Sequence, residues 1–161
     1  MIAADVSVCL WFATEAEAAA TLYTSLLPDS GITRVVDYPI ETPGGGPGGT
    51  MMVEFTLAGR PFMALNGGPG GPHGPGMSMV AQCRDQAELD RVWDTLLADG
   101  GQPQRCGWLT DRFGIAWQVV PAGIGELVGH PDRARAGRVM AAVMTMVKLD
   151  LACLRAAADR G

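Results

Sequence analysis

Hydrophobic and polar positions along this chain switch between a period of two and a helical period, and the switch occurs twice. An apolar run at 6–12 reads as a strand, and residues 15–27 then carry apolar side chains at helical spacing. The same order returns about seventy residues later, with a strand at 78–83 and a helical pattern at 85–97. The pattern predicts a duplicated strand–helix unit.

Both predicted helices begin with the same signal, a polar residue followed three positions later by glutamate. Thr14 precedes Glu17, and Asp85 precedes Glu88. In such a capping box, the two side chains satisfy N–H groups at the helix start that have no partner within the helix. We therefore expect a capping box at the start of each helix.

Strand signals follow each helix, separated by short turns. After the first helix they lie at 32–40, 50–57 and 61–66, and after the second at 106–110 and 115–120. The unit is thus a strand, a helix and a small antiparallel meander. Because its helix covers one face of the sheet, the other face must be covered by the twin unit or left as a cleft.

Two glycine- and proline-rich stretches, 43–49 and 66–76, interrupt this pattern. Neither suits a helix or a central strand, so we expect mobile loops. A third helix is predicted at 133–147, with a stripe of apolar residues at helical spacing, and a short last turn opens at Asp150. The stripe consists of Val139, Met140, Val143, Met144 and Val147.

Composition narrows the class of protein. The chain has 161 residues, 48% hydrophobic and 18% charged, which is typical of a globular domain. The net charge is −5 and lysine and arginine do not cluster, so we expect no nucleic-acid partner. No apolar stretch is long enough to span a bilayer, so we expect no membrane partner. The amino-terminal residues 1–12 lack the features of a signal peptide, which predicts a cytoplasmic location.

The motifs of the chain resemble the PhnB-like family of the vicinal oxygen chelate superfamily, which includes glyoxalase I, extradiol dioxygenases and bleomycin-resistance proteins. The resemblance lies in CLWF, LYTSLLPDS, VEFTLAGRPFMALNGGP, RCGWLTDRFGIAWQVVP and RVMAAVMTMVKLDLACLRAA. It implies an α+β fold in which two βαβββ modules form an open, cup-shaped sheet with helices outside, plus a C-terminal helix. We expect one domain over 1–161, with modules at about 5–67 and 77–121 and a helical tail at 131–158. Such sequences are often labelled 3-demethylubiquinone-9 3-methyltransferase, but no glycine-rich turn follows a first parallel strand here.

The resemblance also says where a metal would bind, because enzymes of the superfamily hold a divalent ion through His, Glu or Gln inside the cup. The corresponding positions here are Ser7, Ser78, Gln118 and either Ala64 or Asn66. Serine and alanine are poor ligands for such an ion. The four cysteines form no CxxC pair, which also argues against zinc and favours reduced thiols. We therefore predict neither a standard metal site nor a cofactor.

Gln118 is the main candidate for ligand binding, because it is an amide in an apolar strand. Alternation places it on one face with Ala116 and Val120 and opposite to Trp117. It either serves a ligand or is an interior amide bonded to a neighbour such as Ser7 or Ser78. The full set of candidate ligand-binding residues is Ser7, Cys9, Trp11, Asn66, Ser78, Trp108 and Gln118, with His73 in the loop as a proton shuttle or a bystander.

Three functions remain open from the sequence. The first is a small-molecule binding protein without a metal, and the alternative is an enzyme of the same superfamily that uses the same cup. The third is a protein whose main task is assembly with a partner. The missing ligand set and the lack of a strong acid–base pair favour binding. The apolar stripe of the third helix predicts a homodimer.

Overall fold

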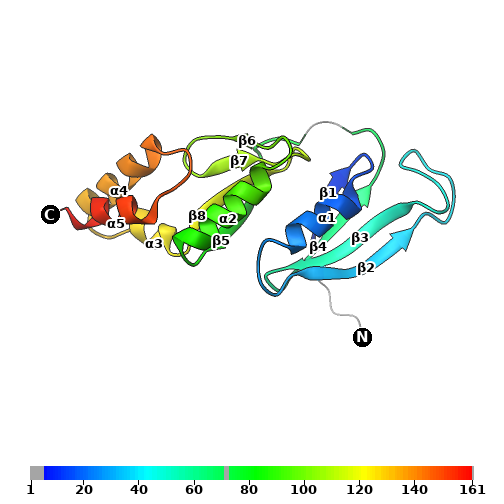
Figure 1. The fold of residues 1–161 in the computed structure, drawn as a ribbon, viewed down its shortest axis with the longest axis horizontal. Coiled ribbons are helices and arrows are strands. Elements are labelled where there is room, and N and C mark those ends of the chain that lie inside the picture. Colours follow the sequence, from blue (N-terminus) through cyan, green and yellow to red (C-terminus); the bar gives the residue numbers. More distant parts are fainter. Residues whose placement is uncertain (1–5, 71–72, 161) are drawn as a thin grey trace. The chain divides into compact units, whose positions relative to one another are not determined.

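The computed structural model describes residues 6–70 and 73–160. The chain forms two compact units, Met1–Pro72 and His73–Gly161. Each unit contains a four-stranded mixed sheet (Figure 1). The ends of the predicted domain, including residue 5 where the first module was expected to begin, lie outside the described residues.

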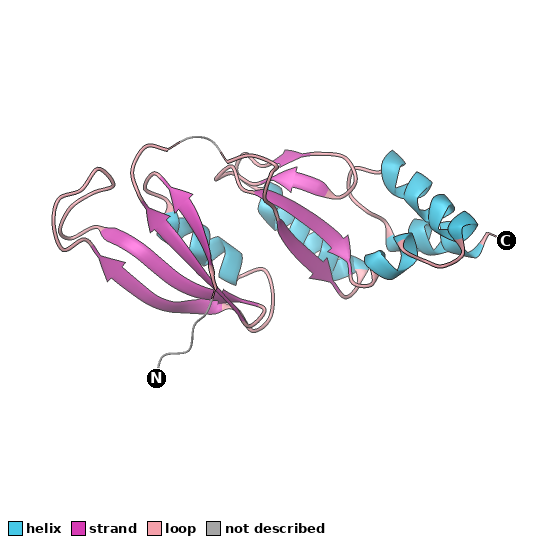
Figure 2. Ribbon diagram, turned by 180° about the vertical axis from the view of Figure 1, so that it is seen from behind, coloured by secondary structure: helices cyan, strands magenta, loops and turns pink. Residues whose placement is uncertain are grey.

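The first unit is a βαβββ module with its helix on one face of the sheet (Figure 2). Its strand order is β1-β4-β3-β2, with β1 parallel to β4 and the other neighbours antiparallel. The elements are β1 (Val8–Phe12), α1 (Ala16–Thr24), β2 (Gly31–Asp37), β3 (Thr50–Leu57) and β4 (Arg60–Asn66).

The second unit repeats this topology and adds three helices at its C-terminal end. Its strand order is β5-β8-β7-β6, with β5 parallel to β8. The elements are β5 (Met79–Cys83), α2 (Gln86–Leu97), β6 (Gln102–Pro103), β7 (Trp108–Thr110), β8 (Ala116–Pro121), α3 (Ile124–Val128), α4 (Arg133–Thr145) and α5 (Leu151–Asp159). The predicted α+β class with two βαβββ modules and a C-terminal helix is confirmed.

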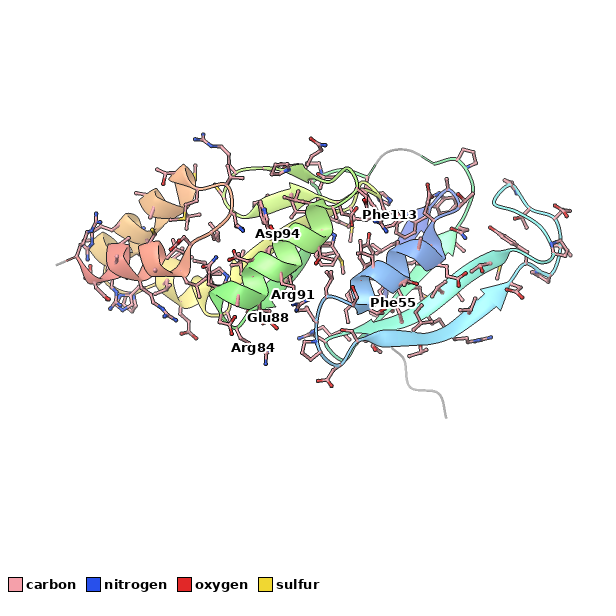
Figure 3. All side chains as sticks on the ribbon, viewed as in Figure 1. Phe55, Arg84, Glu88, Arg91, Asp94 and Phe113 are labelled. Atoms are coloured by element: carbon pink, nitrogen blue, oxygen red, sulfur yellow. The ribbon has the colours of Figure 1, made fainter. Side chains whose placement is uncertain are left out.

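The core of the first unit forms because every second residue of its central strands turns toward α1. Val53, Phe55 and Leu57 of β3 are buried, whereas their neighbours are partly exposed. Phe55, labelled in Figure 3, packs against Tyr23 of α1 with ring centroids 6.4 Å apart. Full burial of one such side chain is worth about 1.5–3 kcal/mol. The period of two thus sets which sheet face stays uncovered.

The predicted N-cap of α2 is confirmed. Asp85 accepts a hydrogen bond from the Glu88 N–H at 2.8 Å. The Glu88 carboxylate, however, accepts from the Arg84 backbone N–H at 2.8 Å and from the Arg84 guanidinium at 2.9 Å rather than from Asp85 (Figure 3). The hydrogen bonds from Arg84 lower the pKa of the Glu88 carboxyl. Local sequence alone is sufficient to start this helix.

The predicted capping box of α1 is wrong. The helix begins at Ala16 after Glu15, which makes no side-chain cap, and no hydrogen bond joins Thr14 to Glu17. The amide of Asn66, at the end of β4, accepts the hydrogen bond from the Ala16 N–H at 2.8 Å instead. A residue 50 positions away therefore performs the task that the local motif was expected to perform.

Four elements of the second unit differ from the expectation. Strand β6 has two residues and helix α3 has five, so neither is long enough to leave a periodic pattern. The expected last turn is a nine-residue helix, α5, where Asp150 accepts from the Cys153 N–H at 2.8 Å. The third helix ends at Thr145 rather than at 147.

Polar contacts attach the segment between α4 and α5 to α2. Lys148 lies 3.0 Å from Asp90 and 3.6 Å from Asp94, one turn apart on α2. The Gln86 side chain donates to the Leu149 carbonyl and accepts from the Leu151 N–H. These bonds fix the C-terminal segment relative to the second sheet within this unit.

The predicted apolar stripe divides into buried and exposed residues, and its last member, Val147, lies beyond the end of α4. Val139 and Val143 are buried, whereas Met140, Met144 and Val147 are 45%, 55% and 46% exposed. Part of the stripe therefore serves the unit's own core, and the rest remains on the surface. None of the described helices combines the length and the apolar content needed to cross a bilayer.

Candidate ligand-binding faces

The second sheet has one face covered by α2 and one open face, and Gln118 lies on the open face. In the sheet register, Gln118 of β8 stands beside Val80 of β5 and Trp108 of β7. Registered neighbours point to the same face. Trp117 and Val119 point to the opposite face and are buried. Val80 is 51% exposed, so the face that carries Gln118 is accessible within this unit.

The amide of Gln118 is oriented by Ser78. Its Nε2 donates to the Ser78 Oγ at 3.0 Å, and this is its one hydrogen bond in the described part of the chain. The amide carbonyl therefore remains available to accept a hydrogen bond. Half-buried Trp108 provides an aromatic wall next to it. The site consists of an oriented amide between an aliphatic and an aromatic side chain.

His73 lies at the β7–β8 turn. Its imidazole ring is exposed and lies next to Gly114. Of the glycine-rich loop 66–76, the structure describes residues 66–70 and 73–76, and residues 71–72 lie outside the described residues.

The first sheet also has an open face, which carries two of the predicted candidates. Cys9 and Trp11 of β1 stand beside Met63 and Leu65 of β4 and point away from α1. Partial desolvation by its neighbours raises the pKa of the Cys9 thiol, although the residue is exposed, and this keeps the thiol protonated and poorly nucleophilic. Ser7 precedes β1, and its hydroxyl donates to the Pro61 carbonyl of β4 at 3.2 Å.

The start of the glycine-rich loop lies over Trp11. The indole Nε1 donates to the Gly68 carbonyl at 3.1 Å. A Cβ at Gly67 would lie 2.1 Å from the ring, and one at Gly70 would lie 2.6 Å from Nε1. Glycine is therefore required for this close approach of backbone to indole. The polar edge of Trp11 is used by the chain itself, whereas its ring remains 44% exposed.

Asn66 lies on the face opposite to Cys9 and Trp11, which differs from its expected place beside them. The register places Asn66 next to Phe12 on the helix-covered face, where it is 6% exposed. Its Nδ2 donates to the Thr50 carbonyl at 2.9 Å, while its Oδ1 caps α1. Ala64, the other residue considered at this position, is fully buried on the same face.

Sequence reasoning missed a carboxylate on the open face of the first sheet. Glu54 of β3 stands in register between Met63 and Arg34, and its Oε1 lies 3.5 Å from the Arg34 guanidinium. The segment TMMVEFTL already indicated the position of Glu54, because Val53 and Phe55 face inward and the residue between them must face outward. Glu54 could pair with a cationic group.

The sequence of residues 4–120, more than two thirds of the chain, matches the family of 3-demethylubiquinone-9 3-methyltransferases. The chain belongs to this PhnB-like family. The PhnB protein from Bacillus cereus is 28% identical with a TM-score of 0.65, and the match covers 73% of this chain and 99% of that one. Protein PA1353 from Pseudomonas aeruginosa is 22% identical with a TM-score of 0.59, and the match covers 74% and 97%. No curated protein matches the chain in sequence.

The resemblance to the PhnB-like family that the motifs predicted is thereby confirmed. Within residues 6–70 and 73–160 of this PhnB-like chain, no three or more His, Cys, Asp or Glu side chains gather closely enough to hold a metal ion.

Proposed function

We propose that this PhnB-like protein binds a small, flat, mostly uncharged molecule on the open face of its second sheet. The observation that supports this function is the Gln118 amide, held by Ser78 between Val80 and Trp108. A binding site for a small molecule commonly combines apolar walls with a few oriented polar groups. The Gln118 carbonyl would accept one hydrogen bond, and Trp108 would stack on the flat body of the ligand.

Chemical considerations favour binding over covalent catalysis. The raised pKa of Cys9 opposes a thiolate nucleophile. The methyl transfer named by the family description is not proposed, because the connection from β1 to α1 consists of Ala13, Thr14 and Glu15. A nucleotide-type cofactor would call for a glycine-rich turn at that point. An enzyme would instead have to use a group such as Glu54, and replacing Glu54 by glutamine would then abolish turnover.

Replacing Gln118 with leucine is expected to weaken ligand binding by about 0.5–1.5 kcal/mol, because one hydrogen bond to a neutral ligand is lost. Native mass spectrometry of the gently purified protein identifies the copurified molecule, and calorimetry then measures its affinity for both proteins. Gln82→Leu is the matched control, since Gln82 is an exposed glutamine of β5 that stands beside Val120 rather than Gln118. Equal affinity of wild type and Gln118→Leu would make Gln118 a merely structural amide.

We expect the protein to form a homodimer through the exposed side of α4. Met140 and Met144 of α4 are large apolar side chains left exposed, as is Val147 just beyond the end of the helix, and such exposure is unusual for a monomer. Light scattering at micromolar concentration should give twice the mass of the chain. The Met140→Glu variant should have a lower measured mass, closer to that of the monomer. Met77→Glu serves as control, because Met77 is 73% exposed on another segment. A wild-type protein of single-chain mass would contradict the prediction.

We also predict that the purified protein carries no tightly bound divalent metal. The family positions are Ser7 and Ser78, whose hydroxyls are weak ligands, and Gln118, whose single amide oxygen cannot supply the three or four ligands that a divalent ion needs. Elemental analysis after purification without chelator should find zinc, nickel, manganese and iron far below one equivalent. Near-stoichiometric metal that disappears in Gln118→Leu would overturn this expectation.

A further inference from the structure

Two sulfur atoms from distant parts of the second unit meet at the β6–β7 connection. The Sγ of Cys106 lies 3.7 Å from the Sδ of Met144, which belongs to the last turn of α4. The two residues are 38 positions apart, so the pair exists only because the tail folds back onto the sheet. This pair is separate from the Gln118 face and uses none of its residues.

The backbone holds the thiol in place. Cys106 has a positive φ of 62°, a conformation that costs a residue other than glycine about 1–2 kcal/mol. The N–H groups of Cys106 and Gly107 donate to the carbonyls of Met146 and Val147, both at 2.8 Å. The Gly107 carbonyl accepts from the Val119 N–H, also at 2.8 Å. Three hydrogen bonds therefore fix a strained turn, and with it the position of the Cys106 side chain.

The sulfur pair lies at the surface of the single chain. Met144 is 55% exposed, and Cys106 is half-buried. Met140, 45% exposed, lies one turn earlier on the same side of α4 and adds a second thioether to this surface. Thiolate and thioether sulfur are soft donors, which favour Cu(I) over Mg²⁺, Ca²⁺ or Mn²⁺.

We propose that Cys106 and Met144 form a binding site for a soft monovalent metal ion, Cu(I) or its redox-inert analogue Ag(I). Taking the zinc–thiolate length of about 2.3 Å for both metal–sulfur bonds, two sulfurs at the observed separation of 3.7 Å subtend an angle of about 107° at the metal. This angle suits trigonal or tetrahedral rather than linear coordination, so at least one position stays open for an external ligand such as a small thiol. On binding, the Cys106 thiol releases its proton to solvent and the thiolate forms the new bond, with no change in oxidation state.

The test is an anaerobic titration of the full chain with Cu(I) in competition with a chromophoric chelator. The parent protein for all variants carries Cys9→Ser and Cys153→Ser, because these two changes remove the exposed thiols outside the proposed site. We expect one equivalent of Cu(I) to bind, with affinity reduced by at least the ~10–100-fold typical of changes around a metal site in both Cys106→Ser and Met144→Leu. Met140→Leu is the matched control and should retain the affinity within about threefold.

Three results would overturn the proposal: no Cu(I) retained against the chelator, unchanged affinity in Cys106→Ser, or unchanged affinity in Met144→Leu, which would indicate a lone thiol. X-ray absorption of the loaded protein adds an independent readout, with at least two sulfur ligands expected. Circular dichroism confirms that the variants are folded. Light scattering on the same samples reports whether loading changes the oligomeric state, because Met144 also belongs to the exposed side of α4.

Discussion

Replacing Asp111 with alanine should destabilise the second unit by about 3–5 kcal/mol. Asp111 is 3% exposed, and its carboxylate accepts hydrogen bonds from the Phe113 and Ile115 N–H groups at 2.9 and 3.0 Å. The other carboxylate oxygen accepts from the Trp117 indole Nε1 at 2.9 Å. Alanine would leave these donors without an acceptor in an interior where water cannot replace it. Urea denaturation followed by tryptophan fluorescence measures the loss, since Trp93, Trp108 and Trp117 all belong to this unit.

The neighbouring residue provides the control for Asp111. Arg112 forms an exposed ion pair with Asp99 at 2.5 Å and stacks over Phe113 at 4.9 Å from its ring centroid. Arg112→Ala should therefore cost about 0–1 kcal/mol, as exposed ion pairs do. The loss of stability in Asp111→Asn should fall between the losses in Asp111→Ala and Arg112→Ala, because an amide retains one acceptor for the backbone but loses the charge. A denaturation midpoint of Asp111→Ala equal to that of Arg112→Ala would show that the network contributes little.

Replacing Asn66 with alanine should destabilise the first unit by about 2–4 kcal/mol. The change removes the acceptor for the Ala16 N–H and the donor for the Thr50 carbonyl, and Ala16 is fully buried. The helix would lose its cap at a point where water cannot supply one. Hydrogen exchange of the Ala16 amide reports the local loss, and urea denaturation followed by far-ultraviolet circular dichroism reports the global one.

The Thr14→Ala variant tests whether α1 is capped by Asn66, which is distant in sequence, or by the adjacent residue Thr14. If Asn66 caps α1, Thr14→Ala changes stability by less than about 0.5 kcal/mol, as an ordinary surface substitution does. Asn66→Asp should lie between wild type and Asn66→Ala, because it keeps the acceptor for Ala16 and loses the donor to Thr50. A larger loss in Thr14→Ala than in Asn66→Ala would restore the local capping box as the start of this helix.

Three features of this protein follow from the sequence because they depend on neighbours within a few positions. The period of two in β8 placed Gln118 opposite to Trp117, as the register shows. The duplicated order of strand, helix and meander predicted two units of the same topology, which the two sheets show. Asp85 caps α2 because its side chain reaches an N–H three residues ahead. Each feature rests on backbone geometry that repeats with a fixed period or on a contact within one turn.

Tertiary structure decided the features that join distant segments. Sequence left open whether Ala64 or Asn66 faces a ligand, and the pairing of β4 with β1 and β3 turned both toward α1. That register also gave Asn66 the capping role that Thr14 was expected to fill. Cys106 and Met144 approach because backbone hydrogen bonds attach the tail to the β6–β7 connection. Such pairings depend on how whole elements pack, and no local pattern of side chains encodes which distant partner will be nearest.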